Sequence, residues 1–497
     1  MGSRRALIHG FAWGALAGIV LVGLMYLSNV LFGLTPLTQA LNEPLLAIMP
    51  GFVFGFLIDT LQHAGKVVEE IGLIVAMVIA LGLLGAAWAW TSHRWRFQHS
   101  ALVFAAAGWL VVSVVLLPVA GEGLLGVGDG LATPLMWAAL FTVYGVVLQL
   151  GGDPANEPAD PDRRRLLSAL PLSIGAVSLG VLALNRVPNW FEAIFNPPEA
   201  GLTGPSPQLT PIENFYVVSK NFGDPNVDGQ SWRLKVGGLV DNPLTITLPR
   251  LQALSSAAEY VTLECISNRV GGPQISTGLF TGVRLKDLVA QAMPQASASW
   301  VAFKAADGYT EGLSLKTVNA EPEILVAYQL DGEPLPMKHG YPARILIPGR
   351  YGMKGPKWLT EIDLVDRESG GYWEQRGWDH NAVVRTMSRI DVPADGEIVK
   401  SKGVDIDGIA YAGTRGISKV EVSTDGGKSW ADTMLTAPLS PLTWVLWQLR
   451  WTPAAEGSYH LMVRATDGAG AVQESAQSDS YPNGSSGYHA IHVSVSK

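Results

Sequence analysis

Cysteine is almost missing from this chain: one such residue, Cys265, occurs among 497 positions. A single cysteine excludes a disulfide within the chain and any zinc site built from several thiolates. Cys265 ends a strand-like run that begins at Tyr260, and a polar, basic and then glycine-rich stretch follows it. A free cysteine is most often a small buried apolar residue, but such a neighbourhood also suits a thiolate ligand or a nucleophile. The residues alone leave both roles open.

Charge is also scarce, since only 16% of the residues are Asp, Glu, Lys or Arg, against about 25% in ordinary soluble domains. The deficit lies before residue 190, where apolar runs reach the ~20 residues that span a bilayer. A shorter apolar stretch, residues 45–61, contains Pro50, Gly51 and Gly55, which predicts a re-entrant or interfacial segment. Five transmembrane helices are predicted, at residues 7–32, 68–90, 101–119, 131–150 and 166–184.

Basic residues flank these predicted helices unevenly. Two arginines, at positions 4 and 5, precede the first predicted helix, and two more, at positions 94 and 96, follow the second. Three arginines, at positions 163–165, precede the last predicted helix. Under the positive-inside rule these segments are cytoplasmic. The N-terminus is then cytoplasmic in a bacterial-type cell membrane, and everything after residue 190 is periplasmic or extracellular. Residues 163–165 also resemble a twin-arginine export motif, and the simpler alternative is that they only set the topology.

Composition divides the chain into five regions. Residues 1–150 hold four spans and the interrupted segment, 151–190 hold a basic loop and the last span, and 191–211 form a proline-rich linker. Residues 212–392 mix strand-like runs with short helices and glycine-rich loops, which predicts an α+β domain. Residues 393–497 show short alternating strands at regular spacing, which is typical of an all-β immunoglobulin-like sandwich.

A series of motifs occurs in order along the α+β region. The motifs are Asn214-Phe215-Tyr216 with Ser219-Lys220-Asn221, Thr262-Leu263-Glu264-Cys265-Ile266-Ser267-Asn268, Ala306-Asp307-Gly308-Tyr309, residues 330–336, residues 339–344, and residues 348–354 followed by Lys357-Trp358-Leu359. Together they resemble the molybdopterin-binding domain of the sulfite oxidase superfamily, and the sandwich resembles the domain that follows it there. Their order along the chain makes the resemblance specific, although it does not extend to the membrane region.

The resemblance implies a cofactor, molybdenum held by the dithiolene of one molybdopterin, by oxo or hydroxo groups and by one protein thiolate. Cys265 is then the metal ligand. His339, Arg344 and Lys357 match the positions that contact the pterin and its phosphate, whose charge and polar edges require cations and donors. The weaker cofactor-binding matches are Asn214, Phe215, Asp307 and Lys354.

The substrate pocket implied by the resemblance departs from that of sulfite oxidases, which hold a small anion with several arginines. Lys220 stands at the first arginine position and Val270 at the second, although Arg269 beside it is basic. Trp378 aligns with the active-site tyrosine, and an indole has no hydroxyl to donate. The predicted catalytic residues are therefore Cys265, Arg269, Trp378 and Lys220.

Three functions are compatible with these residues. The first is two-electron chemistry on a small oxyanion such as sulfite, and the second is reduction of a sulfoxide, as in methionine sulfoxide reductase relatives of the superfamily. The third is not enzymatic: a membrane-anchored binding protein that keeps the fold without the metal, because fold alone does not fix function.

The expected partners are a small-molecule substrate, an external or membrane electron carrier, the lipid bilayer, and a second copy bound through the sandwich. Haem in the membrane region needs two histidines at matching depth. His9 and His99 both fall near cytoplasmic ends of spans, away from the catalytic domain, so haem is not favoured. The formal net charge of −8 provides no basic patch for nucleic acid. The four candidate histidines are His9, His63, His93 and His99.

Overall fold

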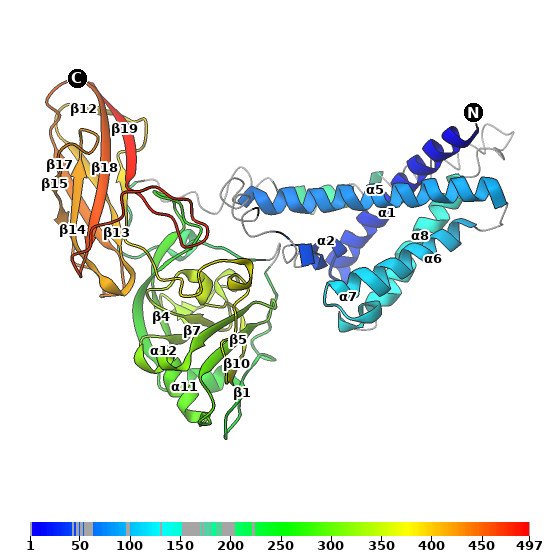
Figure 1. Cartoon of the computed structure of the whole chain (residues 1–497), viewed down its shortest axis with the longest axis horizontal. Coiled ribbons are helices and arrows are strands. Elements are labelled where there is room, and N and C mark those ends of the chain that lie inside the picture. The colour runs from blue at the N-terminus through cyan, green and yellow to red at the C-terminus, as the bar shows by residue number, and fades with distance from the viewer. Residues whose placement is uncertain are drawn as a thin grey trace. The chain divides into compact units, whose positions relative to one another are not determined.

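The structure is a computed structural model of the chain (Figure 1). It describes residues 2–41, 63–95, 100–129, 132–151, 204–220 and 224–496, with isolated positions among residues 44–53 and 169–190. The twin-arginine-like motif, and most of the interrupted segment, the last span and the proline-rich linker, lie outside the described residues. Two compact units divide the chain: Met1–Met49 with Leu61–Pro197, and Pro50–Thr60 with Pro198–Lys497.

The first unit is a bundle of apolar helices. Four stretches among the described residues are long and apolar enough to cross a membrane, and they match the first four predicted spans: Arg4–Phe32, Val67–Ser92, Ser100–Val119 and Ala132–Gly151. The elements are α1 (Gly2–Phe32), α2 (Leu37–Ala40), α5 (His63–Trp95), α6 (Ser100–Val111), the π-helical turn η1 (Val112–Leu116), α7 (Leu117–Val119), the 3-10 helix η2 (Leu124–Asp129) and α8 (Ala132–Gly151).

Glycines allow α1 and α5 to pack closely. A Cβ on Gly14 would lie 2.6 Å from the carbonyl oxygen of Leu81, and one on Gly85 would lie 2.4 Å from that of Gly10. Small residues at a crossing let two helix backbones approach. Any larger residue at Gly14 or Gly85 would therefore push the two helices apart.

A buried carboxylate ties four segments of this bundle together. Glu70 of α5 is 2% exposed, and its Oε1 accepts a hydrogen bond from the Tyr26 hydroxyl at 2.8 Å. The Nε of Arg186 lies 3.2 Å from the same oxygen, and the Trp190 indole N–H donates to Oε2 at 2.8 Å. The Tyr26 hydroxyl also shares a 2.8 Å hydrogen bond with Thr38 of α2. Buried charges persist when they are paired in this way.

Glu70→Ala should destabilise the bundle strongly, because it leaves the Arg186 guanidinium buried without its counter-ion. Breaking a buried pair on one side typically costs about 3–5 kcal/mol. The measurement is thermal loss of helical circular dichroism for the full chain in detergent, and the midpoint should fall by several degrees. Thr38→Val, which removes only the outermost hydrogen bond, is the matched control and should fall far less. Equal midpoints for the two variants would contradict this role of Glu70.

The second unit begins with two sheets that share one core. The first sheet has the order β2-β1-β10-β5-β6, with β1 and β10 parallel, and the second has the order β3-β4-β7-β8, with β9 beside β7. The core takes residues from both sheets, including Leu234, Val301 and Val326. The strands are β1 (Arg233–Gly238), β2 (Leu244–Thr247), β3 (Ala257–Glu264), β4 (Ile275–Arg284), β5 (Trp300–Ala305), β6 (Thr310–Ser314), β7 (Leu325–Leu330), β8 (Glu333–Pro334), β9 (Arg344–Leu346) and β10 (Leu359–Val365).

Short helices join these strands, as an α+β domain requires. Thr247 caps α10 by accepting a hydrogen bond from the Arg250 N–H, and Ser314 caps α12 in the same way. The helices are η4 (Ile212–Asn214), α10 (Leu248–Gln252), α11 (Leu285–Gln291), α12 (Leu315–Ala320), η5 (Met337–His339), η6 (Gly352–Lys354) and η7 (Glu374–Arg376).

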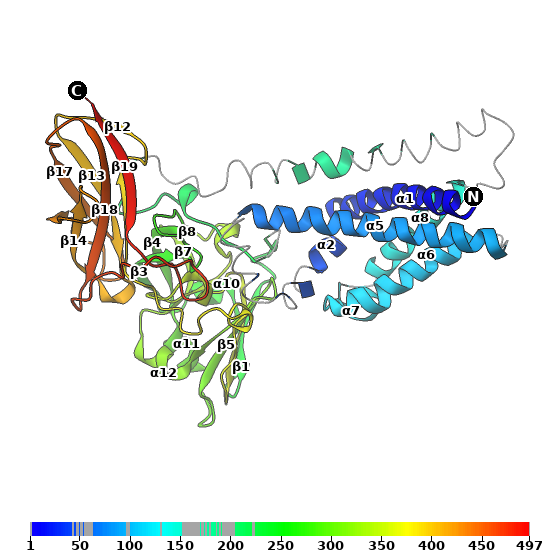
Figure 2. The same ribbon diagram turned by 45° about the horizontal axis from the view of Figure 1, so that its top comes forward.

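Two further sheets enclose the core of the C-terminal region (Figure 2), with the orders β11-β13-β17-β16 and β12-β19-β18-β14-β15. Buried residues of both, such as Ile406, Val422 and Trp447, form one cluster, which confirms a two-sheet sandwich; the finer immunoglobulin-like assignment stays a prediction. The elements are β11 (Met387–Val392), β12 (Ile398–Lys400), β13 (Val404–Tyr411), η8 (Gly413–Arg415), β14 (Ile417–Ser423), β15 (Ala431–Asp432), β16 (Met434–Leu435), β17 (Val445–Trp451), β18 (Gly457–Asp467) and β19 (His489–Ser496).

The sandwich starts earlier than the predicted boundary at residue 393. Strand β11 pairs with β13, from Met387 opposite Tyr411 onward, so it is the first strand of the sandwich. Pro393 marks the end of β11, because proline interrupts a strand. The visible change in the sequence pattern therefore falls after the first strand of the sandwich and not before it. The pairing of β11 with β13 assigns β11 to the sandwich, and composition does not reveal this pairing.

Hydrogen bonds from the sandwich hold strand β3. The Tyr411 hydroxyl donates to the Thr262 carbonyl at 2.9 Å, and the Trp444 N–H donates to the Thr262 side chain at 2.8 Å. The Ser440 hydroxyl donates to the carbonyl of Tyr260 at 2.6 Å. The strand that leads to Cys265 is thus fixed by both domains of this unit.

Candidate functional site

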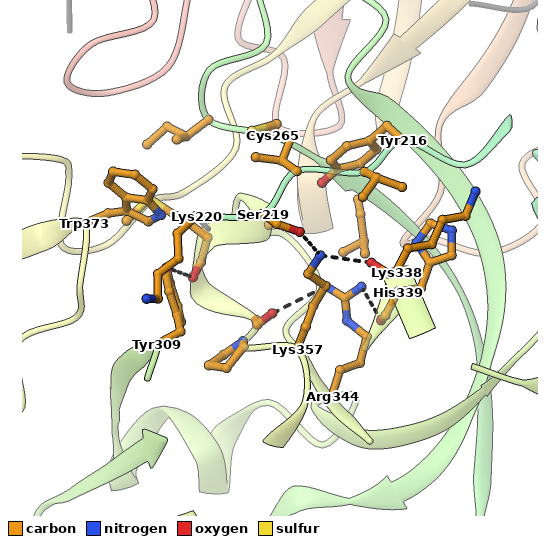
Figure 3. Close-up of a pocket in the computed structure, with 18 of the residues that line it drawn as sticks. Tyr216, Ser219, Lys220, Cys265, Tyr309, Lys338, His339, Arg344, Lys357 and Trp373 are labelled. Atoms are coloured by element: carbon orange, nitrogen blue, oxygen red, sulfur yellow. Dashed lines mark hydrogen bonds between the residues drawn. The ribbon is translucent and has the colours of Figure 1, made fainter. Parts of the chain in front are cut away.

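One cavity of the second unit gathers residues from motifs that lie far apart in the sequence (Figure 3). Cys265 lies against this cavity, and basic side chains and aromatic rings surround it. Eight of the predicted site residues line the cavity: Phe215, Lys220, Cys265, Asp307, His339, Arg344, Lys357 and Trp378.

Cys265 is presented by a loop that begins where β3 ends. The Asn268 side chain closes this loop: its amide donates to Glu264 at 3.0 Å, and its oxygen accepts from the Gln274 N–H at 3.0 Å. The Cys265 Sγ lies 3.0 Å from the Ser267 oxygen, and the Ser267 hydroxyl donates to the Gln274 side-chain oxygen at 3.1 Å. Cys265 is 8% exposed, so the residue is largely enclosed although it lines the cavity.

Basic side chains gather on one side of the cavity. Arg344 of β9 donates to the carbonyls of His339, at 3.2 Å, and Gly355, at 3.4 Å. The Lys357 amine donates to the Ser219 hydroxyl at 2.7 Å and to the Lys338 carbonyl at 2.9 Å. Figure 3 shows Lys338, His339 and Arg344 on the side opposite Trp373 and Lys220. This end of the cavity suits an anionic, polar ligand.

Burial and mutual repulsion set the protonation of this basic end. Burial, followed by the charges of Arg344, Lys338 and Lys357, lowers the pKa of His339 to about 3, so its imidazole is neutral near pH 7. Burial lowers the pKa of Arg344 to about 10, and the guanidinium stays charged. Within the described part of the chain, His339 Nε2 and Arg344 Nε are buried without a hydrogen-bond partner. Such buried polar atoms fit a ligand rich in polar edges.

Aromatic rings form the opposite side of the cavity. Figure 3 shows Tyr309, Trp373 and Lys220 there, and Asp307 and Trp378 also line the cavity. Burial raises the pKa of Asp307, and the Lys220 charge opposes that shift. Asp307 and Lys220 therefore lie close enough for their opposite charges to interact.

Lys354, a predicted cofactor-binding residue, is not among the residues that line the cavity. Its amine is buried between two carboxylates, 2.5 Å from Glu311 Oε1 and hydrogen-bonded to Glu374. Burial raises the pKa of Glu311 to about 8. Burial also opposes ionisation of Glu374, but the Gly371 N–H and Lys354 outweigh it and leave the pKa of Glu374 below its ordinary value. Lys354 therefore neutralises a buried acidic pair.

Two more predicted site residues lie away from the cavity lining. Arg269 and Asn214 are exposed, and neither lines the cavity, whereas their sequence neighbours do or lie close to it. Phe215, next to Asn214, packs edge-on against His339 with ring centroids 5.4 Å apart. Lining residues that the sequence analysis missed lie within or beside the motifs: Tyr216, Ser219, Tyr309, Lys338 and Trp373.

Two family models match this unit. Residues 221–373 match the "Oxidoreductase molybdopterin binding domain", and residues 379–493 match the "Mo-co oxidoreductase dimerisation domain". The second unit therefore contains the domain pair of a molybdopterin-dependent oxidoreductase.

Relatives define the group more closely. Mitochondrial sulfite oxidase of Mus musculus is 30% identical over 349 residues, which are 60% of this chain and 63% of that protein. The human enzyme is 31% identical over 338 residues, 58% of this chain and 62% of that protein. Nitrate reductase [NAD(P)H] of Hordeum vulgare is 30% identical over 325 residues, 52% of this chain and 36% of that protein. The chain thus spans less than two thirds of these relatives.

A solved structure shares the fold. The sulfane dehydrogenase SoxCD from Paracoccus pantotrophus superposes with a TM-score of 0.51 at 23% identity, covering 59% of this chain and 82% of that one. In sequence, the matched residues of this chain are similar to the catalytic and dimerisation domains of sulfite oxidases.

Glu311 should make the stability of this unit depend on pH. A carboxyl whose folded-state pKa is raised, here from 4.5 to about 8, stabilises the fold fully below pH 4.5 and loses that contribution as the pH rises through about 8. The glutamine in Glu311→Gln cannot titrate. As the pH rises from 4.5 to about 8, the unfolding midpoint of the wild type should therefore fall relative to that of Glu311→Gln. Tryptophan fluorescence during heating measures both midpoints. Glu213→Gln, at an exposed site, is the control, and parallel wild-type and Glu311→Gln profiles would disprove the assignment.

Proposed function

We propose that this chain is a membrane-anchored oxidoreductase that binds molybdenum through molybdopterin and acts on a small oxyanion or oxide outside the cytoplasmic membrane. The observation that carries the proposal is the cavity itself, where the single cysteine of the chain meets a buried basic end and an aromatic end. The two domain matches and the sulfite oxidase relatives support it.

Each end of the cavity has its own task in this proposal. Cys265 would supply the thiolate that holds the metal. Arg344, His339 and Lys357 hold the pterin and its phosphate, because they provide cations and unpaired buried polar atoms on one side. The bound cofactor supplies two-electron oxygen-atom chemistry, and the protein orients the reactants and excludes water.

The aromatic end receives the substrate. Lys220 orients an anionic or polarised oxygen, and Trp373 and Trp378 shield it from solvent. Oxidation of sulfite to sulfate consumes one water and releases two electrons and two protons. Reduction of a sulfoxide to a sulfide runs in the opposite redox direction: it consumes two electrons and two protons and releases water.

Sulfoxide reduction is the second candidate for a specific reason. Asp307 offsets the charge of Lys220, and the aromatic rings of Tyr309, Trp373 and Trp378 line the cavity. A neutral oxide loses less hydration on entering such a site than a dianion does.

The proposed setting follows from the helical unit and the flanking charges. Its apolar helices serve as the bilayer anchor, the positive-inside rule assigns the catalytic domain to the outer side, and the sandwich pairs two copies, in line with its match to a dimerisation domain. Electrons pass between the cavity and an external or membrane carrier.

The decisive experiment is metal and pterin analysis of the full chain, purified in detergent from cells that make the cofactor. We expect about one molybdenum and one pterin per chain in the wild type, and loss of the metal in Cys265→Ser, since a hydroxyl is a poor substitute for a thiolate ligand.

Ser255→Ala is the control for that measurement, because Ser255 is exposed and away from the cavity lining. It should retain wild-type molybdenum. A wild type without metal or pterin would overturn the proposal and favour the non-enzymatic membrane-anchored binding module.

Lys220→Met separates the two candidate substrates. If the substrate is an oxyanion, loss of a charge-assisted hydrogen bond should lower kcat/KM for sulfite by about 10- to 150-fold, while Lys220→Arg keeps most activity. Sulfite oxidation is followed with ferricyanide and dimethyl sulfoxide reduction with reduced viologen. Wild-type turnover of dimethyl sulfoxide alone, insensitive to Lys220→Met, would favour the sulfoxide reductase.

A further inference from the structure

The aromatic end of the cavity is built on one short turn, residues 371–378, here called the tryptophan turn. Its two indoles, Trp373 and Trp378, both line the cavity. The backbone N–H of Trp378 donates to the Trp373 carbonyl at 3.2 Å, which closes the turn that carries both side chains. Figure 3 shows Trp373 beside Lys220 and across from the basic end.

From within the domain, this turn is held by a buried charge. Glu374 lies between the two tryptophans in sequence and is 6% exposed. One of its oxygens pairs with the Lys354 amine, and the other accepts the Gly371 N–H at 2.8 Å. Lys354 itself follows Met353, which lines the cavity. One ammonium thus joins the tryptophan turn to a neighbouring part of the cavity wall.

From outside the domain, the same turn is held by the sandwich. The Tyr481 ring packs edge-on against Trp378, with centroids 5.2 Å apart and planes at 84°. The Asp379 N–H donates to the Pro482 carbonyl at 3.2 Å. Gly377 permits this approach, since it has φ 86° and a Cβ there would lie 2.4 Å from the Tyr481 hydroxyl.

We propose that the tryptophan turn is the specificity-determining wall of the cavity, and that Lys354 and Tyr481 are the positioning residues that set where it stands. Neither Lys354 nor Tyr481 lines the cavity in the described part of the chain. They act through Trp373 and Trp378, which fix how much room the substrate end leaves beside Cys265. This inference rests on the proposed function and extends it to residues that contact no substrate.

Tyr481→Ala tests the outer contact. Loss of an edge-on aromatic pair should speed amide hydrogen exchange across residues 371–379 by about 2- to 10-fold. The same change should shift KM, for whichever of sulfite and dimethyl sulfoxide the wild type turns over, by a similar factor, with kcat within about twofold. Tyr481→Phe keeps the ring and should restore wild-type values in both measurements.

Glu374→Gln tests the inner contact without creating a cavity. It removes the charge that pairs with Lys354 but keeps an oxygen for the Gly371 N–H, so exchange should rise at residues 371–379 and not throughout the domain. The matched control is Tyr488→Ala, which removes a tyrosine packed edge-on against Trp430, 5.6 Å away at 80°, elsewhere in the sandwich. It should leave residues 371–379 unchanged.

Unchanged exchange at residues 371–379 in Tyr481→Ala, or an equal rise in Tyr488→Ala, would overturn the positioning role. A rise in exchange with an unchanged KM would overturn the specificity role. Amide exchange needs no turnover, so these outcomes are separate from failure of the proposed function, which would appear as a wild type lacking molybdenum.

Discussion

The catalytic domain depends on one constraint: it must hold the cations Arg344 and Lys357 close together in a poorly solvated site. Arg344 is 7% and His339 2% exposed, and the amine of Lys357 lies within the same group. Like charges in a poorly solvated site repel strongly. Backbone carbonyls relieve part of this repulsion, because those of His339, Gly355 and Lys338 all accept from these cations. The neutral state of His339 relieves more, and an anionic ligand would complete the balance.

The surrounding fold can be understood as the support for that arrangement. Two sheets supply rigid strand ends, and the loops that carry the cavity residues leave them as short 3-10 turns, such as η5 and η6. The sandwich adds hydrogen bonds to Thr262 and, from the Ser485 hydroxyl, to the Asn268 carbonyl at 2.7 Å. The loop that presents Cys265 is therefore braced by two domains, and its position is not left to the loop alone.

Much of this arrangement could be predicted from sequence, and the failures have physical reasons. Alternating strands and ordered motifs predicted the α+β domain and eight of the residues that line the cavity, because residues near Cys265 or His339 in the chain are often near them in space. Lys354 was misplaced because its partners, Glu311 and Glu374, lie 43 and 20 positions away. Lys354 follows Met353 in a 3-10 turn, so its side chain points in a different direction from that of Met353. The sequence motif does not reveal that direction.

The helical unit shows the same limit. Apolar length predicted the first four helices, whose lengths are those that a bilayer requires. The pairing of Glu70 with Arg186 could not be read from the sequence, because it joins residues more than a hundred positions apart, in different segments. Isolated charges in apolar runs indicate that a partner exists, but packing alone decides which.

The solitary sulfur beside Ser267 has a chemical consequence of its own. A thiolate oxidised to a sulfenic acid is usually rescued when a second cysteine of the same protein condenses with it. This chain has no such resolving thiol, so oxidation of an unligated Cys265 could be reversed only by an outside reductant. Early metal binding would thus protect the residue as well as equip it.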